Sequence, residues 1–185
     1  MVGVEPLRIA VIIGSTREGR VGDGIGRWVA DVAAGRDDVE PVVVDLADYD
    51  FPPCYPARPT PEVRRFTGQV ADADGFVVVT PEYNRSFPAS LKQAIDYAYD
   101  EWQAKPAGFV SYGYRSEGFH AVEHLRTVFT ELHVMTMRTG VGVNLLAGEP
   151  IDTEHRRCAA AAMFDQLTWW ASALKEARTR RPYVS

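Results

Sequence analysis

The sequence predicts an α/β domain in which a doubly wound parallel sheet carries helices on both faces. Apolar runs rich in β-branched residues, such as 7–13 and 77–79, are nearly continuous rather than alternating. Such runs are typical of parallel strands that are buried on both sides. Segments with helical spacing separate the strand-like runs, so five strands alternate with five helices. With 185 residues, of which 46% are hydrophobic, the chain is expected to form one domain over residues 1–185.

The order of the elements follows from this alternation. Strands are expected over 7–13, 39–46, 75–80, 106–113 and 134–143. Helices are expected from the apolar spacing at 25–32, 62–73, 88–102, 122–132 and 152–178.

Three features refine this outline. Pro41 places the second strand at an edge of the sheet, because proline cannot donate to a ladder. The proline-rich segment 48–61 is expected to be a shaped loop near the crevice, whose aromatic residues either wall the substrate space or cap the sheet. The helix over 88–102 carries aromatic residues on several faces, which predicts that part of it packs against another subunit.

Composition excludes several classes of function. A net charge of −5 and a pI near 5.4 argue against a nucleic-acid partner, which would require a basic face. Cys54 and Cys158 form no CxxC pair, which suggests a reducing compartment. The amino terminus has no charged region followed by a long apolar core, and 7–13 is too short to span a bilayer. We therefore expect a cytoplasmic protein without a membrane partner.

The loop after the first strand is expected to bind a phosphate. Residues 14–19 imitate the spacing of a nucleotide-triphosphate P-loop, but Arg20 and Val21 stand where lysine and Ser or Thr are required. The glycines at 22–26 are out of phase with the dinucleotide fingerprint GxGxxG. A donor-rich loop that opens a helix is nevertheless an anion site, and the alternative is a glycine-rich turn without a ligand. The donors of this loop are Ser15, Thr16, Arg17 and Arg20.

The loop after the third strand is suited to hold a flat polar ring. It contains no metal cluster and no nucleophile with its base, and it leads into the helix that Pro88 opens. Pro81 restricts the chain, so the amides of Glu82, Tyr83 and Asn84 are expected to point in a fixed direction. Amides that are fixed in this way can hydrogen-bond the edge of a heterocycle.

These two loops carry a resemblance to a known family. The runs GSTREGRVGDGIGRWV and PEYNRSFPASLKQAIDYA resemble the FMN-phosphate loop and the isoalloxazine-binding loop of the NADPH-dependent FMN reductases. The later SYG and AVEHLR runs resemble the second flavin-side loop and its helix. The resemblance implies a flavodoxin-like fold with strand order 2-1-3-4-5, FMN as cofactor, and NADPH or NADH as co-substrate. It also implies a homodimer or homotetramer.

The resemblance assigns thirteen residues to FMN. The phosphate would be held by Ser15, Thr16, Arg17, Val21 and Gly22. The ring and ribityl chain would be lined by Pro81, Glu82, Tyr83, Asn84 and Ser86, and the other side would be closed by Ser111, Tyr112 and Gly113.

The fourth loop departs from the family pattern. Tyr114 and Glu117 stand where the family usually has small residues. A tyrosine there could stack on the ring, narrow the substrate space, or block the flavin.

Other polar residues have more than one interpretation. Glu82 could act as a proton donor, although its amide is the group we expect to matter. His120 and His124 share a helix face and could bind one metal, although a solvated or interface face is favoured without a third ligand. Asp45 could hold a ribose, although a solvated carboxylate at a strand end is favoured.

The function implied by the resemblance is an FMN-dependent oxidoreductase. It would take hydride from NADPH or NADH and pass electrons to a small acceptor such as a quinone, an azo compound, a metal ion or free flavin. The hydride moves through the flavin N5, so no catalytic protein nucleophile and no metal site are expected. The alternatives are a flavodoxin-like electron carrier and a scaffold of the same fold that has lost the flavin.

Overall fold

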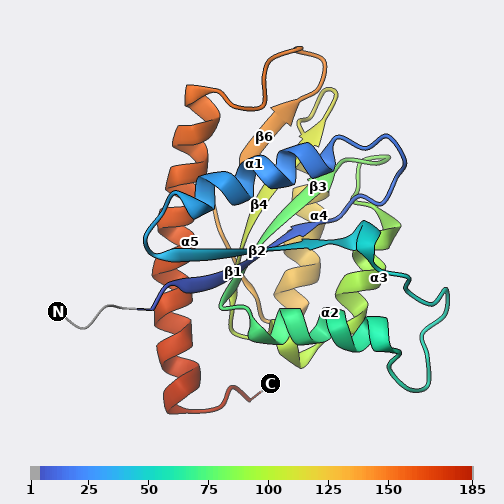
Figure 1. Cartoon of the computed structure of the whole chain (residues 1–185), viewed down its shortest axis with the longest axis vertical. Helices are drawn as coiled ribbons and strands as arrows, with labels where there is room; N and C mark the ends of the chain where they lie inside the picture. The colour runs from blue at the N-terminus through green and yellow to red at the C-terminus, as the bar shows by residue number, and fades with distance from the viewer. Residues whose placement is uncertain (1–4, 185) are drawn as a thin grey trace.

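One parallel sheet separates two helical layers in the computed structural model, which describes residues 5–184 (Figure 1). Helices α1 and α5 cover one face of this sheet, and α2, α3 and α4 cover the other. The elements in chain order are β1 (Leu7–Ile13), α1 (Gly22–Ala34), β2 (Val39–Asp45), η1 (Leu46–Asp48), α2 (Pro61–Asp72), β3 (Gly75–Pro81), α3 (Ala89–Tyr97), η2 (Asp100–Trp102), β4 (Pro106–Gly113), α4 (Phe119–Glu131), β5 (Met135–Thr136), β6 (Val141–Asn144) and α5 (Glu154–Arg180).

The strand order confirms the expected topology. The sheet runs β2-β1-β3-β4-β5 with parallel pairing throughout, and β6 also pairs with β4. Strand β2 pairs with β1 alone, so Pro41 lies at an edge as predicted. The carboxyl ends of β1, β3 and β4 point to the same end of the sheet, which brings the loops that follow them together.

The fifth strand is not continuous, in contrast to the expectation for 134–143. Strand β5 pairs with the start of β4 and β6 with its end, while residues 138–140 bulge between them. The bulge is held from α5, where the Gln166 side chain donates to the Thr139 hydroxyl at 2.8 Å. A Cβ at Gly140 would lie 2.8 Å from the carbonyl oxygen of Phe109, so the backbone passes β4 too closely for a side chain. Neither signal is visible in hydrophobic periodicity.

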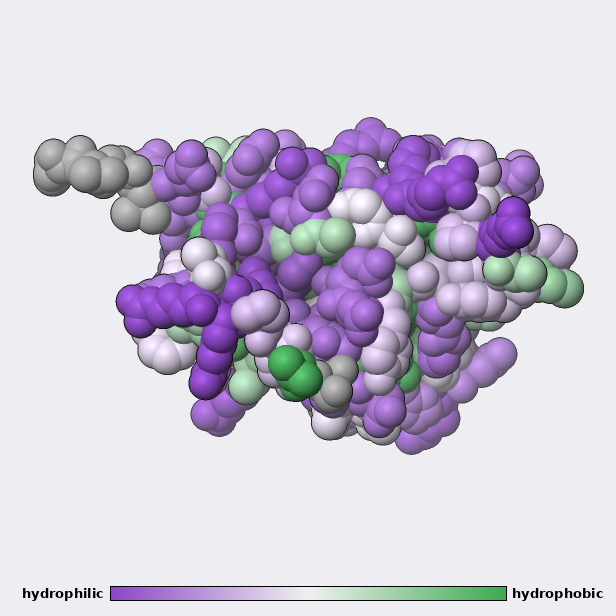
Figure 2. Space-filling model, turned by 90° about the horizontal axis from the view of Figure 1, so that it is seen from below, coloured by the Kyte–Doolittle hydropathy of each residue, from purple (hydrophilic) through white to green (hydrophobic). Residues whose placement is uncertain are grey.

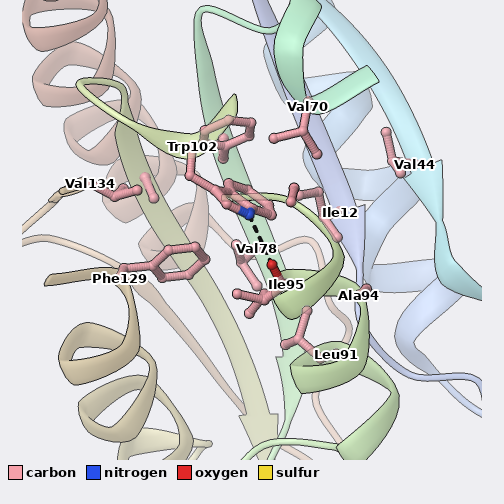
Figure 3. Packing of buried hydrophobic residues seen from close by; sticks show 14 of the residues in the cluster. Ile12, Val44, Val70, Val78, Leu91, Ala94, Ile95, Trp102, Phe129 and Val134 are labelled. Atoms are coloured by element: carbon pink, nitrogen blue, oxygen red, sulfur yellow. Dashed lines mark hydrogen bonds between the residues drawn. The ribbon is translucent and has the colours of Figure 1, made fainter. Parts of the chain in front are cut away.

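The aromatic residues expected at a subunit interface lie mostly in the core. Helix α3 ends at Tyr97, and Trp102 follows in η2 with no exposed surface. Its indole N–H donates to the carbonyl of Ile95 at 3.1 Å, and its ring packs edge-on against Phe129 (Figure 3). The prediction was wrong for Tyr97 and Trp102, because both are buried within the domain: the Tyr97 hydroxyl donates to the Pro52 carbonyl at 2.8 Å, and the turn after α3 places Trp102 over Ile95.

The opposite face is built by α1 and the long α5. Ile25 and Val29 of α1 and Phe164 and Leu167 of α5 are fully buried against the sheet. A Cβ at Gly26 would lie 2.4 Å from the terminal side-chain carbon of Ile13 in β1, which shows how closely α1 approaches the sheet.

The outer surface is largely polar where it is seen from below (Figure 2). Hydrophobic residues appear there singly rather than as one broad patch. No helix within residues 5–184 combines the length and the apolar character needed to cross a membrane. The expectation about the amino-terminal segment falls partly on residues 1–4, which lie outside the described residues.

Candidate functional site

The loop after β1 forms an open cradle of backbone donors. Its start is fixed, because the Gly14 amide donates to Val79 at 2.9 Å and the Ser90 hydroxyl donates to the Gly14 carbonyl at 3.0 Å. Within residues 5–184, the amides of 16–19 and of 22–24 at the start of α1 have no protein acceptor. Val21 precedes α1 without a side-chain cap, so the helix amino terminus stays open. Free amides and a helix dipole that face the same space favour a phosphate.

Arg20 does not add its charge to this cradle as expected. Its guanidinium donates to both carboxylate oxygens of Asp45 and to the Ser15 carbonyl, each at 2.5 Å. Hydrogen bonding to Asp45 raises the pKa of Arg20 above its ordinary value. Asp45 is therefore neither solvated nor free to hold a ribose, and the ion pair fastens the loop to the end of β2.

Ser15 joins the first loop to the loop after β3. Its buried hydroxyl lies 3.1 Å from the hydroxyl of Tyr83. The two loops lie beside each other at one end of the sheet in Figure 1, in blue after β1 and in green after β3. The structure thus brings the predicted phosphate and ring loops together.

The ring loop is a tight two-residue turn. Tyr83 and Ser86 exchange backbone hydrogen bonds of 2.8 and 2.9 Å, and the two residues between them have φ angles of 51° and 65°. Both angles are left-handed, as in a type I′ turn. Among the described residues, the amides of Asn84 and Arg85 have no protein acceptor, so both are available to a ligand. Neither residue is glycine, and the sequence signal for this turn is therefore weak.

The other two amides expected to face the ring are already used. The Glu82 amide donates to the carbonyl of Tyr112 at 2.9 Å, and the Tyr83 amide closes the turn. That part of the expectation was wrong, and only the Asn84 amide remains of the three. The Glu82 carboxylate instead accepts a hydrogen bond from the His120 amide in the first turn of α4, at 3.1 Å.

The residues of the SYG run face different directions. The Ser111 hydroxyl donates to the carbonyl of Glu117 at 2.7 Å. The Tyr112 side chain is buried under α1, where a Cβ at Gly22 would lie 2.4 Å from its hydroxyl. Burial raises the pKa of Tyr112 to about 12, so the phenol stays protonated. The Tyr112 side chain therefore lies beneath the predicted phosphate loop and not beside the ring loop.

The two unusual residues of the fourth loop also separate. Tyr114 is 65% exposed. Glu117 has a left-handed φ of 54°, and its carboxylate lies over Gly142 of β6. Glu117 thus points toward β6, which leaves Tyr114 as the residue of this pair that could meet a flat ligand.

The histidines of α4 and the proline-rich loop complete the surroundings. His124 Nδ1 lies 3.0 Å from the Ser86 hydroxyl. Within residues 5–184, no three His, Cys, Asp or Glu side chains come together as a metal site. In the proline-rich loop, Phe51 packs into the core, whereas Tyr55 lines a cavity of about 750 Å³ beside Ser86 and Phe87. Phe51 thus covers the core as one of the two alternatives expected, and a wall of the substrate space by Tyr55 stays a prediction.

The fold and these loops define a class of protein. A doubly wound sheet of order 2-1-3-4-5 carries the predicted phosphate loop and the predicted ring loop at the carboxyl ends of its strands, which is the arrangement of a flavodoxin-like protein. The family profile described as NADPH-dependent FMN reductase matches residues 7–145. The chain belongs to this family.

Relatives of known sequence agree with this assignment. The chain is 38% identical over 122 residues to the NAD(P)H-dependent FMN reductase ntnL of Nectria sp, a match that spans 57% of this chain and 59% of that protein. It is 35% identical over 141 residues to a 2-hydroxy-1,4-benzoquinone reductase of Burkholderia sp, over 71% of this chain and 74% of that protein.

Solved structures show the same fold. FerB, a flavoenzyme NAD(P)H:(acceptor) oxidoreductase from Paracoccus denitrificans, matches with a TM-score of 0.76 and 22% identity, over 90% of this chain and 98% of that one. A flavodoxin mutant from Pseudomonas aeruginosa matches with a TM-score of 0.56 and 19% identity, over 91% of this chain and 99% of that one.

Proposed function

We propose that the protein is an FMN-dependent NAD(P)H oxidoreductase that passes electrons to a small acceptor. The observation that carries this proposal is the joining of two sets of free amides by the Ser15–Tyr83 contact of 3.1 Å. One set suits a phosphate and the other suits the polar edge of a ring, so the pair fits a phosphorylated flavin. Family membership and the names of the relatives support the same cofactor.

Each side of the site has its own task in this proposal. The amides of Thr16 and Arg17 and the first turn of α1 hold the phosphate, while Tyr112 and Gly22 set the floor beneath it. The turn amides of Asn84 and Arg85 orient the ring edge. Bound FMN supplies the hydride chemistry, and the protein binds, orients and shields it. The remaining residues assigned by resemblance shape the two loops through backbone contacts, packing or side-chain hydrogen bonds within the protein: Ser15, Val21, Pro81, Glu82, Tyr83, Ser86, Ser111 and Gly113.

We further propose a quinone as the acceptor. Relatives named as a benzoquinone reductase and an NADPH:quinone oxidoreductase support this acceptor class. The exposed ring of Tyr114 offers a flat apolar surface at the mouth of the site. The proposal includes NADPH or NADH as donor, a homodimer or homotetramer of one domain over residues 1–185, and a cytoplasmic location.

A flavodoxin-like electron carrier is the second candidate, and the charges around the site favour the enzyme. Arg17, Arg85 and Arg115 are all exposed at this end of the molecule. Cations suit the phosphates of a nicotinamide nucleotide, whereas a carrier is expected to show a dense acidic face.

The visible spectrum of the purified protein, with and without added FMN and then with anaerobic NADPH or NADH, tests the proposal. We expect flavin absorbance that bleaches with the nucleotide and returns when a benzoquinone is added. Bound flavin that neither nucleotide reduces would indicate the carrier. A colourless protein that does not bind added FMN would overturn the proposal in favour of the flavin-less scaffold.

A further inference from the structure

We propose that the carboxylate of Glu82 is a positioning residue that clamps the ring loop to α4. This role differs from the proton donor and from the amide contact that the sequence suggests. Its effect on the flavin rests on the proposed function, whereas the clamp itself is a property of the fold.

Glu82 forms hydrogen bonds to β4 and to α4 at the same time. It follows Pro81 at the end of β3, and its amide extends the sheet by donating to Tyr112 at 2.9 Å. Its carboxylate crosses to α4 and accepts from the His120 amide at 3.1 Å. One residue thus fixes the ring loop to the strand below it and to the helix beside it.

Helix α4 needs a cap from elsewhere because its own N-cap position cannot supply one. Gly118 occupies that position with a left-handed φ of 85° and no side-chain cap. A Cβ there would lie 2.4 Å from the Cβ of Ser111, so no capping side chain fits. The Phe119 amide is satisfied by the Ser116 carbonyl, and the next amide is the one that Glu82 takes. A carboxylate at a helix amino terminus also complements the helix dipole.

The clamp sets the slot in which a flat ring would lie. The Asn84 and Arg85 amides face the ligand from one loop, and the turn that leads into α4 flanks the other side. A Cβ at Gly113 would lie 3.5 Å from the Cβ of Glu82, so the two loops are in direct contact at this point. Losing the carboxylate would free the loops to move apart, and the flavin would then have to order them on binding.

Two substitutions of Glu82 distinguish the effect of side-chain length from the effect of its negative charge. In Glu82→Gln the amide oxygen can accept the same hydrogen bond without a charge or a titratable proton. In Glu82→Asp the charge remains, but the side chain is one methylene too short for a 3.1 Å contact. The clamp predicts that Gln behaves like the native protein and that Asp behaves like Glu82→Ala. A proton donor predicts the reverse order, with Asp active and Gln inactive.

The experiment uses two readouts on the purified chain of 185 residues. The first is hydrogen exchange of the α4 amino-terminal turn in flavin-free protein, which requires no cofactor. The second is FMN affinity together with turnover of NADPH and a benzoquinone. We expect the Glu82→Ala and Glu82→Asp variants to lose protection from hydrogen exchange at the His120 amide and to bind FMN up to roughly 30-fold more weakly. The Glu82→Gln variant should stay within about fivefold of the native protein in both readouts. Glu123→Ala, an exposed carboxylate on the same helix, is the control and should change neither.

The outcomes distinguish the clamp from the proposed function. Unchanged hydrogen exchange in Glu82→Ala and Glu82→Asp would overturn the clamp. A Glu82→Gln variant that binds FMN normally but has lost turnover would also overturn it. If the native protein does not bind FMN while Ala and Asp still lose protection, the proposed function fails and the clamp stands. If Ala does not fold, the comparison of Gln with Asp decides alone.

Discussion

Gly22→Ala tests whether Tyr112 really forms the floor of the phosphate loop. Gly22 is buried at the start of α1, and an added Cβ would lie 2.4 Å from the Tyr112 hydroxyl and 3.3 Å from the ring carbon that bears it. The tyrosine is 4% exposed and cannot swing away easily. Crowding of this kind costs about 1–3 kcal/mol. The higher helix propensity of alanine returns up to about 1 kcal/mol, so we expect a net loss of up to about 2 kcal/mol.

The second half of the test removes the obstructing atom. In Tyr112→Phe the hydroxyl that the new Cβ would meet first is gone. In that background the nearest ring atom is at 3.3 Å, a tight contact that a small shift of the ring relieves, so Gly22→Ala should be close to neutral. The two substitutions should therefore show a favourable coupling energy of about 1–3 kcal/mol.

Urea unfolding of the four proteins measures this coupling without any cofactor. Gly24→Ala is the matched control in the same helical turn, because its Cβ would meet nothing closer than Ile151 at 3.9 Å. It should be tolerated or slightly stabilising. Additive losses for Gly22→Ala and Tyr112→Phe would refute the placement of the tyrosine beneath the loop.

Three further predictions concern residues around the site and at the far end of the sheet. Arg20→Ala leaves the half-buried Asp45 carboxylate unpaired and should cost about 1–3 kcal/mol in urea unfolding, whereas Arg27→Ala, from an exposed pair, should cost less than about 0.5 kcal/mol. Burial lowers the pKa of Lys105 to about 8, so the folded protein releases this proton before the unfolded chain does. The resulting stability is complete above the ordinary lysine pKa and is lost as pH falls through about 8. Between pH 8 and 9.5 the free energy of unfolding of the native protein should therefore rise by up to about 2 kcal/mol more than that of Lys105→Met. Equal pH dependence of the two unfolding free energies would contradict this. Gly118→Ala combines a left-handed φ with a 2.4 Å clash and should cost more than about 2 kcal/mol in thermal unfolding; a native-like midpoint would show that the loop can be rebuilt.

The sequence by itself determined the architecture and the location of the site. Continuous apolar runs such as Leu7–Ile13, separated by helical spacing, were sufficient for a doubly wound sheet, and the loop motifs indicated the strand ends at which a ligand is expected. This information is local, because burial periodicity and turn chemistry are expressed within a few neighbouring residues. The strand order and the edge position of Pro41 agree with it.

Only the tertiary structure decided which groups in those loops are free. Arg20 meets Asp45 25 residues away, and Glu82 reaches the amide of His120 38 residues away. Tyr112 points under α1 rather than toward the ring because the register of β4 fixes the face on which each side chain lies. Such pairs depend on how strands and helices pack across the sheet, and sequence spacing carries no record of that. The local pattern therefore located the candidate site, and the packing decided which of its donors are already paired within the protein.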